Sequence, residues 1–313
     1  MKEENGRKFA YQFTFFKVGI LPTTPKLASD WATSTLIMGH AAISDLDTEK
    51  HYFSEVLYRV VPMLGGFGAD SLIAWSRGPT GTKDKWTLSW NGEAFDFVMG
   101  DLWQKIGFVL STRPTKPLIF QGPNGYSRKG PGESAASQYY SFTRLATSGA
   151  ISIGSDTFEV TGESWMDKEF GSNQLGQYQI GWDWFSLQLD DQREVMLYML
   201  RDQDGQTNHA SGTVVKKDGT TQYLNKDAFS VTATDQWTSD NTSATYPSKW
   251  TLEVNGEQWV VEPEMADQEN RARKVPRLFY WEGAVKISDK NGKPIGKGYV
   301  ELTGYGNGTK PGI

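Results

Sequence analysis

The chain has 313 residues, which is long for a single hydrophobic core and suits two domains of roughly 150 residues each. Its formal net charge of −5 argues against a nucleic-acid partner, because such a partner requires a basic face. The absence of cysteine excludes disulfides and thiolate chemistry, and no apolar run reaches the roughly 18 residues of a membrane span.

The first quarter of the chain is predicted to consist mainly of strands. Aromatic residues make up 13% of the sequence and recur with Gly-containing turns, a pattern that favours strands over helices. The alternating segments 8–17, 35–45 and 51–61 are predicted strands joined by short polar turns. One or two helical turns are expected within 62–78. The opening MKEENGRKF lacks the apolar segment of a signal peptide.

A repeated hairpin is the clearest organisational signal in the sequence. Residues 85–93 read KWTLSWNGE, and residues 249–257 read KWTLEVNGE. Both predict two strands joined by an Asn-Gly turn, because Asn and Gly accept the positive φ angles of a two-residue turn. The register expected from such a turn pairs Leu88 with Phe95, Trp86 with Phe97, Leu252 with Trp259 and Trp250 with Val261.

The middle of the chain is predicted to continue the same pattern. Residues 121–137 are rich in Gly, Pro and Ser and are expected to form a long loop across a barrel mouth. Residues 150–162 read as a further strand, and residues 181–201 read as a complete hairpin with a polar turn. The first half of the chain offers a counterpart only to the second strand of that hairpin, so an opening strand is expected to precede Met1.

These features predict an all-β fold of two consecutive antiparallel β-barrels, because a sheet that closes on itself leaves no open edge. The expected domains are residues 1–174 and 175–313, with the boundary in the polar segment GSNQLGQ. Barrels of about eight strands can hold one small ligand. An aromatic-rich pair of barrels therefore implies a cavity for a small apolar molecule, inside one barrel or between the two.

The segment GESWMDKEFG (162–171) carries the first candidate catalytic carboxyls. Strand alternation places Asp167 and Glu169 on one face and Lys168 on the other. Two carboxyls and a lysine offer an acid, a base and a charge that tunes them. The alternative is a solvated or salt-bridged strand end.

The segment GWDWF (181–185) carries the second candidate. Alternation places Asp183 on the face opposite to Trp182 and Trp184. Asp is disfavoured inside a strand and costly to bury without a partner, so its position requires a reason. One reason is a carboxyl that desolvation keeps protonated near neutral pH, ready to donate a proton. The alternative is that Asp183 caps a backbone group or pairs with Lys168 or Arg201.

His40 is the remaining candidate, in the middle of the predicted strand 35–45 between apolar neighbours. It is either a buried, hydrogen-bonded structural residue or a cavity-lining acid, base or ligand donor. The sequence lacks the residues that several other kinds of site require. The chain has only three His and no Cys for a zinc site, no G-x-S-x-G nucleophile motif and no phosphate-binding loop.

At these residues the sequence resembles the lipocalin-like family that includes carotenoid 1,2-hydratases, kievitone hydratase and the AttH-type proteins. The resemblance runs over nearly the whole chain. In this family the motif at 167–170 normally reads Asp-His-Glu-Trp, whereas this chain has Asp-Lys-Glu-Phe. The segments that carry the resemblance are 9–17, 38–45, 122–130, 137–145, 162–171, 181–191, 246–250, 267–269, 280–287 and 298–305.

The resemblance implies two consecutive lipocalin-like barrels and the cofactor-independent, metal-free addition of water to a double bond of an isoprenoid or similar apolar substrate. Such a reaction needs a dry proton donor and a positioned water. Asp183 is the expected donor, and Asp167 or Glu169 is expected to orient the water. Lys168 is the fourth candidate of the catalytic group. The expected binding residues are His40, Trp165, Trp182, Trp184, Phe185 and Tyr198.

A second hypothesis is a non-catalytic carrier of a small hydrophobic molecule, since lipocalin-like cavities often only bind. A related hydrolase, isomerase or cyclase on the same scaffold is a third. All of these imply a small apolar partner, no nucleic acid and no membrane span, with peripheral contact with lipid as a further expectation. Relatives are often exported, which leaves the localisation of this chain open.

Overall fold

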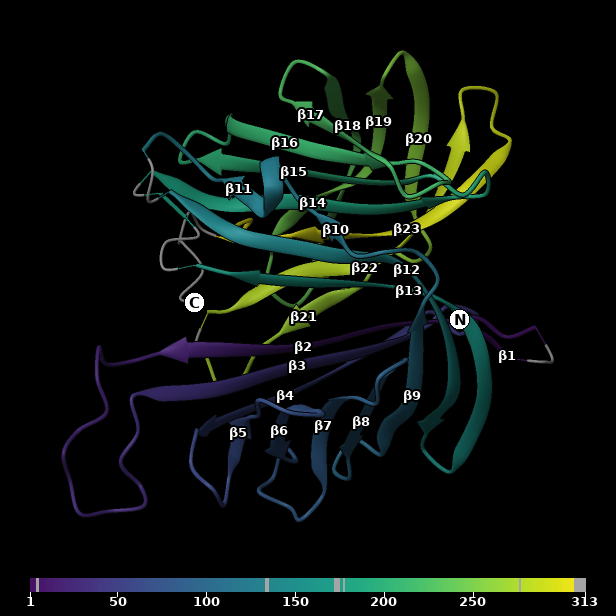
Figure 1. The fold of residues 1–313 in the computed structure, drawn as a ribbon. Coiled ribbons are helices and arrows are strands. Elements are labelled where there is room, and N and C mark those ends of the chain that lie inside the picture. The colour runs from purple at the N-terminus through teal and green to yellow at the C-terminus, as the bar shows by residue number, and fades with distance from the viewer. Residues whose placement is uncertain (4–5, 133–134, 172–174, 177, 276, 307–313) are drawn as a thin grey trace.

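The computed structural model describes residues 1–313 except 4–5, 133–134, 172–174, 177, 276 and 307–313. Over the described residues the chain is almost entirely antiparallel β-structure (Figure 1). None of the described helices has the length and hydrophobicity that crossing a bilayer requires. The boundary expected at 174/175 falls where residues 172–174 and 177 lie outside the described part.

The first large sheet follows the order β1-β13-β12-β9-β8-β7-β6-β5, and β10 and β11 also pair with β12. Its described strands are β1 (Lys2–Glu3), β5 (Gly65–Phe67), β6 (Leu72–Arg77), β7 (Lys85–Trp90), β8 (Phe95–Asp101), β9 (Ile106–Pro114), β10 (Ile119–Phe120), β11 (Tyr126–Arg128), β12 (Ala136–Ile153) and β13 (Asp156–Phe170).

A separate three-stranded sheet lies against this first sheet and completes the first barrel-like unit. Its strands are β2 (Phe9–Gly19), β3 (Thr35–Asp45) and β4 (Lys50–Arg59). Alternate residues of β2 and β3, such as Phe9 and Ile43, are buried in one core with Trp86 and Phe108 of the larger sheet.

The second large sheet follows the order β17-β16-β15-β14-β23-β22-β20-β19-β18, and β21 also pairs with β22. It curls around a core that includes Phe185, Trp250, Val261 and Ile287. Its described strands are β14 (Gln179–Leu189), β15 (Glu194–Asp202), β16 (Thr207–Val215), β17 (Thr221–Asn225), β18 (Phe229–Thr238), β19 (Thr245–Val254), β20 (Glu257–Pro263), β21 (Glu269–Arg271), β22 (Phe279–Asp289) and β23 (Pro294–Leu302). The fold is therefore all-β with two lipocalin-like, barrel-like units.

The prediction of one or two helical turns within 62–78 is wrong. This segment forms the short strands β5 and β6, which pair with each other. In β6, Ala74 and Ser76 are buried and their neighbours are more exposed, which is the period-2 pattern of a strand. The expected loop 121–137 contains the 3-10 turn η1 (Pro123–Gly125) and β11, which pairs with β12.

The register of the second repeated hairpin is confirmed, and that of the first is wrong. Leu252 pairs with Trp259 across a two-residue turn in which Asn255 and Gly256 both have positive φ. In the first hairpin Leu88 instead pairs with Phe97, and Trp86 lies beyond the last residue pair of the hairpin ladder. The reason is that the Asn91 side chain accepts hydrogen bonds from the backbone N–H groups of the two residues 93 and 94, so the turn is wider by two residues.

The two barrel-like units pack against each other through the outer surfaces of their sheets. Figure 1 shows β2, β3, β12 and β13 of the first unit beside β14, β22 and β23 of the second. One end of this interface is fixed by the buried carboxylate of Glu194, which forms ion pairs with Lys116 and Arg144 of the first unit. Elsewhere in the interface, Ser44 of the first unit donates a hydrogen bond to Gln268 of the second unit. Specific polar contacts therefore help to hold the two units together.

Candidate functional site

The candidate site lies in this interface, and its first element is Asp167 near the end of β13. One carboxylate oxygen, Oδ1, accepts hydrogen bonds from the Ser141 hydroxyl and from Trp165 Nε1, the latter at 2.9 Å. The Asp167 side chain is exposed to solvent, although protein atoms are densely packed near its carboxyl. Burial raises the pKa of Asp167 to about 6 against the lowering effect of hydrogen bonds from Ser141, Trp165 and Tyr139.

The second element is a pair of glutamates placed side by side by sheet register. Glu282 of β22 and Glu301 of β23 are directly opposite each other. Side chains at such positions have Cβ atoms about 5 Å apart, so two carboxylates would repel each other. Burial and the neighbouring glutamate raise the pKa of Glu282 well above its ordinary value, and burial raises the pKa of Glu301 to about 7. The pair therefore retains a proton at neutral pH.

Asp167 and the glutamate pair form one electrostatic group. The negative charge of Asp167 contributes to the raised pKa of both Glu282 and Glu301. Glu301 is also close to Trp182, whose side chain donates a hydrogen bond to it. The effects that shift these three pKa values are burial, neighbouring carboxyls and neutral hydrogen-bond donors. Such a group can hold and exchange protons near pH 7.

Aromatic side chains surround the carboxyls. The rings of Trp165 and Trp184 lie edge to face, with centroids 6.3 Å apart, across the boundary between the units. Trp184 Nε1 donates a hydrogen bond to the Tyr139 hydroxyl at 3.0 Å. Burial is the main cause of the strongly raised pKa of Tyr139 and Tyr299, so both remain neutral hydroxyls. The carboxyls thus lie beside indole and phenol rings.

His40 lies in the same interface, on the face of β3 that is directed towards the second unit. Its Nδ1 is 2.8 Å from the Tyr280 hydroxyl, and Phe16 and Phe53 contact its ring edge to face. In the described part of the chain Nε2 has no hydrogen-bond partner. Burial lowers the pKa of His40 to about 4, so the imidazole is neutral at pH 7.

We expect His40 to make the protein less stable as the pH falls. Its folded pKa of about 4 lies below the ordinary value of 6.5, so the unfolded chain takes up the proton first and unfolding becomes easier between these two pH values. The loss relative to His40→Gln should reach about 3 kcal/mol at pH 4. Urea denaturation of both proteins from pH 7 to pH 4 measures it. Identical pH slopes for the two proteins would contradict the buried, neutral state of His40.

Asp183 lies elsewhere, on the inner side of β14 within the second unit. Arg201 Nε donates a hydrogen bond to its Oδ1 at 2.9 Å in a buried ion pair, and the Tyr305 hydroxyl donates to both oxygens. The Arg201 guanidinium lies over the Tyr305 ring at 3.8 Å. Burial raises the pKa of Asp183, and Arg201 opposes that rise. An ion-paired carboxylate facing a barrel core does not fit the expected role of proton donor, and the pairing with Arg201 agrees with the alternative reading.

Only some of the other predicted site residues lie in the interface. Glu169 forms an ion pair with Lys129 at 2.5 Å. Lys168 is exposed, opposite Tyr140 on the other face of β13. Phe185 is fully buried in the core of the second unit against Trp250, which does not fit a binding role. Tyr198 packs in a cluster with Tyr139, Trp165, Trp182 and Trp184.

Sequence reasoning missed the glutamate pair and the tyrosines that contact the candidate carboxyls. A signal was present, because alternation in YWEGAVKI and GYVELTGY places Glu282 and Glu301 on the faces opposite to the buried Trp281 and Val300. What alternation does not reveal is that these two outward faces lie beside each other and against the first unit.

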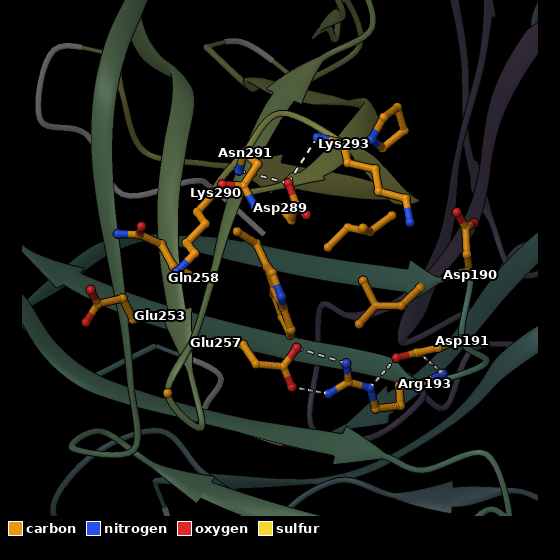
Figure 2. Close-up of a pocket in the computed structure, with 15 residues that line it drawn as sticks. Asp190, Asp191, Arg193, Glu253, Glu257, Gln258, Asp289, Lys290, Asn291 and Lys293 are labelled. Carbon is orange, nitrogen blue, oxygen red and sulfur yellow. Dashed lines mark hydrogen bonds and ion pairs between the residues drawn. The ribbon is translucent and has the colours of Figure 1, made fainter.

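A separate pocket of about 680 Å³ lies at the turns of the second unit (Figure 2). Its charged groups largely bind one another. Arg193 lies between Asp191 and Glu257, with an ion pair to each, and Asp289 accepts hydrogen bonds from the backbone of its own turn. These contacts stabilise the hairpin turns, so this pocket is a weaker candidate than the interface. In the described part of the chain no cluster of three or more His, Asp and Glu side chains is arranged to hold a metal ion.

Comparison with known proteins identifies the family. No curated protein matches the chain. Among solved structures, an AttH-type protein from Nitrosomonas europaea is similar at 30% identity and a TM-score of 0.83, over 98% of this chain and 90% of that one. Kievitone hydratase from Nectria haematococca has a TM-score of 0.70 at 13% identity, over 97% of this chain and 86% of that one, which shows a shared fold. The AttH-like family matches residues 1–305, and the chain belongs to this family.

Proposed function

We propose that this protein is a cofactor-independent hydratase, which adds water to a carbon–carbon double bond of an apolar substrate of isoprenoid type. The observation that carries the proposal is the directly opposed pair Glu282 and Glu301, beside Asp167 and among tryptophan rings. Protonating an unactivated double bond requires an acid that is dry and still protonated at neutral pH. The hydratase of similar fold agrees with this class of reaction.

The geometry divides the two proton-transfer roles between the carboxyls. Asp167 accepts hydrogen bonds from a hydroxyl and an indole, which limit the rise of its pKa to about 6, so it ionises before the glutamate pair and suits a base. The glutamate pair has raised pKa values and suits an acid. Carboxyls whose surroundings separate their pKa values in this way are a recurring basis of acid–base catalysis.

The proposed reaction balances its protons within the site. The glutamate pair donates a proton to one alkene carbon, which leaves a carbocation on the other. A water molecule adds to that carbon and gives its extra proton to Asp167. The proton then returns from Asp167 to the glutamate pair, whose pKa values respond to the charge on Asp167. The faces of Trp165, Trp182 and Trp184 can stabilise the transient cation by roughly 1 kcal/mol each where they face it.

A product search tests this proposal. The protein is incubated with a cell lipid extract, and mass spectrometry identifies compounds that are retained and compounds that gain one water. The expected result is a hydrated product that forms with the wild-type protein and not with Glu301→Gln. A compound that both proteins retain unchanged would instead indicate the carrier function and overturn the hydratase proposal.

The reaction should have a bell-shaped pH dependence. The base Asp167 must be ionised, so kcat/KM should rise as the pH increases through about 6. The glutamate pair must retain a proton, so kcat/KM should fall as the pH increases above about 7. Initial rates from pH 5 to pH 9 measure both limbs. A rate that increases steadily up to pH 9 would be incompatible with a carboxyl acid.

A further inference from the structure

The loop between β2 and β3 has several exposed apolar side chains. Leu27 is 67% exposed and Trp31 is 47% exposed, and Ile20 and Leu21 are similarly open. Figure 1 shows this loop, drawn in purple, extending beyond the sheets. A loop that presents leucine, isoleucine and tryptophan to solvent carries an unfavourable hydration free energy unless another apolar phase covers it.

Basic residues surround this loop although the whole chain has a net charge of −5. Residues 272–275 pack on the same end, because Ala272 and Val275 belong to one apolar cluster with Phe16 of β2 and Leu57 of β4. We call this surface, together with the exposed apolar residues of the loop, the end surface. Its exposed cations are Lys17, Lys26, Arg59, Arg273, Lys274 and Arg277.

The end surface is next to the candidate site. Met38 and Tyr280 belong to the apolar cluster that joins residues 272–275 to the three-stranded sheet, and Tyr280 also contacts His40. In Figure 1, β13 ends and β14 and β22 begin on the side from which the loop extends. An apolar environment that covers the end surface would therefore lie close to the interface that contains Asp167, Glu282 and Glu301.

We propose that the end surface docks on an anionic lipid membrane. Apolar and aromatic residues enter the headgroup region of a bilayer while neighbouring lysines and arginines contact lipid phosphates, which is the arrangement found here. The concentration of cations on one end of an acidic chain favours an anionic surface over a neutral one. This inference concerns binding alone and does not depend on the proposed reaction.

Vesicle co-sedimentation of the full chain tests the inference. The probes are vesicles of phosphatidylcholine alone and vesicles in which about one third of the lipid is phosphatidylserine. The wild-type protein should bind the anionic vesicles and release them at high salt. The double variant Lys26→Glu/Arg277→Glu should bind about 25-fold or more weakly, because each basic residue near the surface strengthens binding by a factor of about five. Leu27→Ser/Trp31→Ser should weaken binding by about the same factor.

A matched control uses Trp103, which is 81% exposed in the turn between β8 and β9. Trp103→Ser should leave vesicle binding unchanged. Because the chain has no cysteine, Ala28→Cys and Lys217→Cys each allow one polar fluorophore to be attached. The fluorescence emission of the label at residue 28 should shift to shorter wavelength with anionic vesicles, and the emission of the label at residue 217 should not shift. Equal binding to both vesicle types, an equal loss with Trp103→Ser, or lipid-free self-association through the loop would overturn the inference.

Discussion

Glu301→Gln is expected to lower the rate of product formation by about a hundredfold or more, the usual contribution of a general acid. The amide keeps the size of the side chain and its position opposite Glu282, but it cannot donate a proton to carbon. Ligand affinity should change little, because the surrounding tryptophans remain. Product formation is measured by mass spectrometry, and binding by the quenching of tryptophan fluorescence in the site.

Two further variants make this result specific. Glu253→Gln changes an exposed glutamate of β19 and should leave the rate unchanged. Glu282→Gln should lower the rate as Glu301→Gln does, and the double variant should add little, because residues that act as one unit are not additive. Glu301→Gln with a rate within about twofold of the wild type would show that the pair is not the acid.

The separate roles of the glutamate pair as acid and Asp167 as base depend on the packing of the two barrels against each other. Within the second unit, register places Glu282 beside Glu301 on an outer face, where water would normally solvate both carboxyls. The first unit covers that face with β13, which brings the indole of Trp165 and the carboxyl of Asp167. Neither unit alone would raise these pKa values, since burial is their main cause.

Local chemistry made part of the fold predictable from sequence. The Asn255-Gly256 turn fixed the register of its hairpin because both residues accept positive φ. The same dipeptide at 91–92 gave the wrong register for its hairpin. There the Asn91 side chain accepts hydrogen bonds from backbone N–H groups of the turn, and the loop is wider. The segment 62–78 was wrongly predicted because its apolar and polar residue types do not alternate clearly, and short segments of that kind resemble helical turns.

The candidate site was only partly predictable for a different reason. Alternation correctly separates Asp167 from Lys168 and Asp183 from Trp182, but it cannot show which neighbour each face will meet. Asp183 faces inwards to Arg201, a partner on the next strand. Asp167 faces the second unit, and the two glutamates whose pKa it raises lie more than a hundred residues away in the chain. Such partnerships depend on tertiary packing rather than on local pattern.

Asp183→Asn is expected to destabilise the protein by about 3–5 kcal/mol, because it leaves the buried Arg201 guanidinium without its counter-charge. The exposed fractions of the two side chains are 9% for Arg201 and 11% for Asp183, so water can replace little of the lost interaction. Urea denaturation should show a lower midpoint with an unchanged slope, since the surface exposed on unfolding stays the same.

The double variant Asp183→Leu/Arg201→Met is the matched control for this prediction. It removes both charges together and should restore much of the lost stability, because apolar residues of similar size can replace a buried ion pair. The rate per folded molecule should remain close to that of the wild type in Asp183→Asn, since Asp183 faces the core of the second unit and not the interface. If Asp183→Asn instead kept its stability and lost turnover, Asp183 would be the proton donor and the glutamate pair would not.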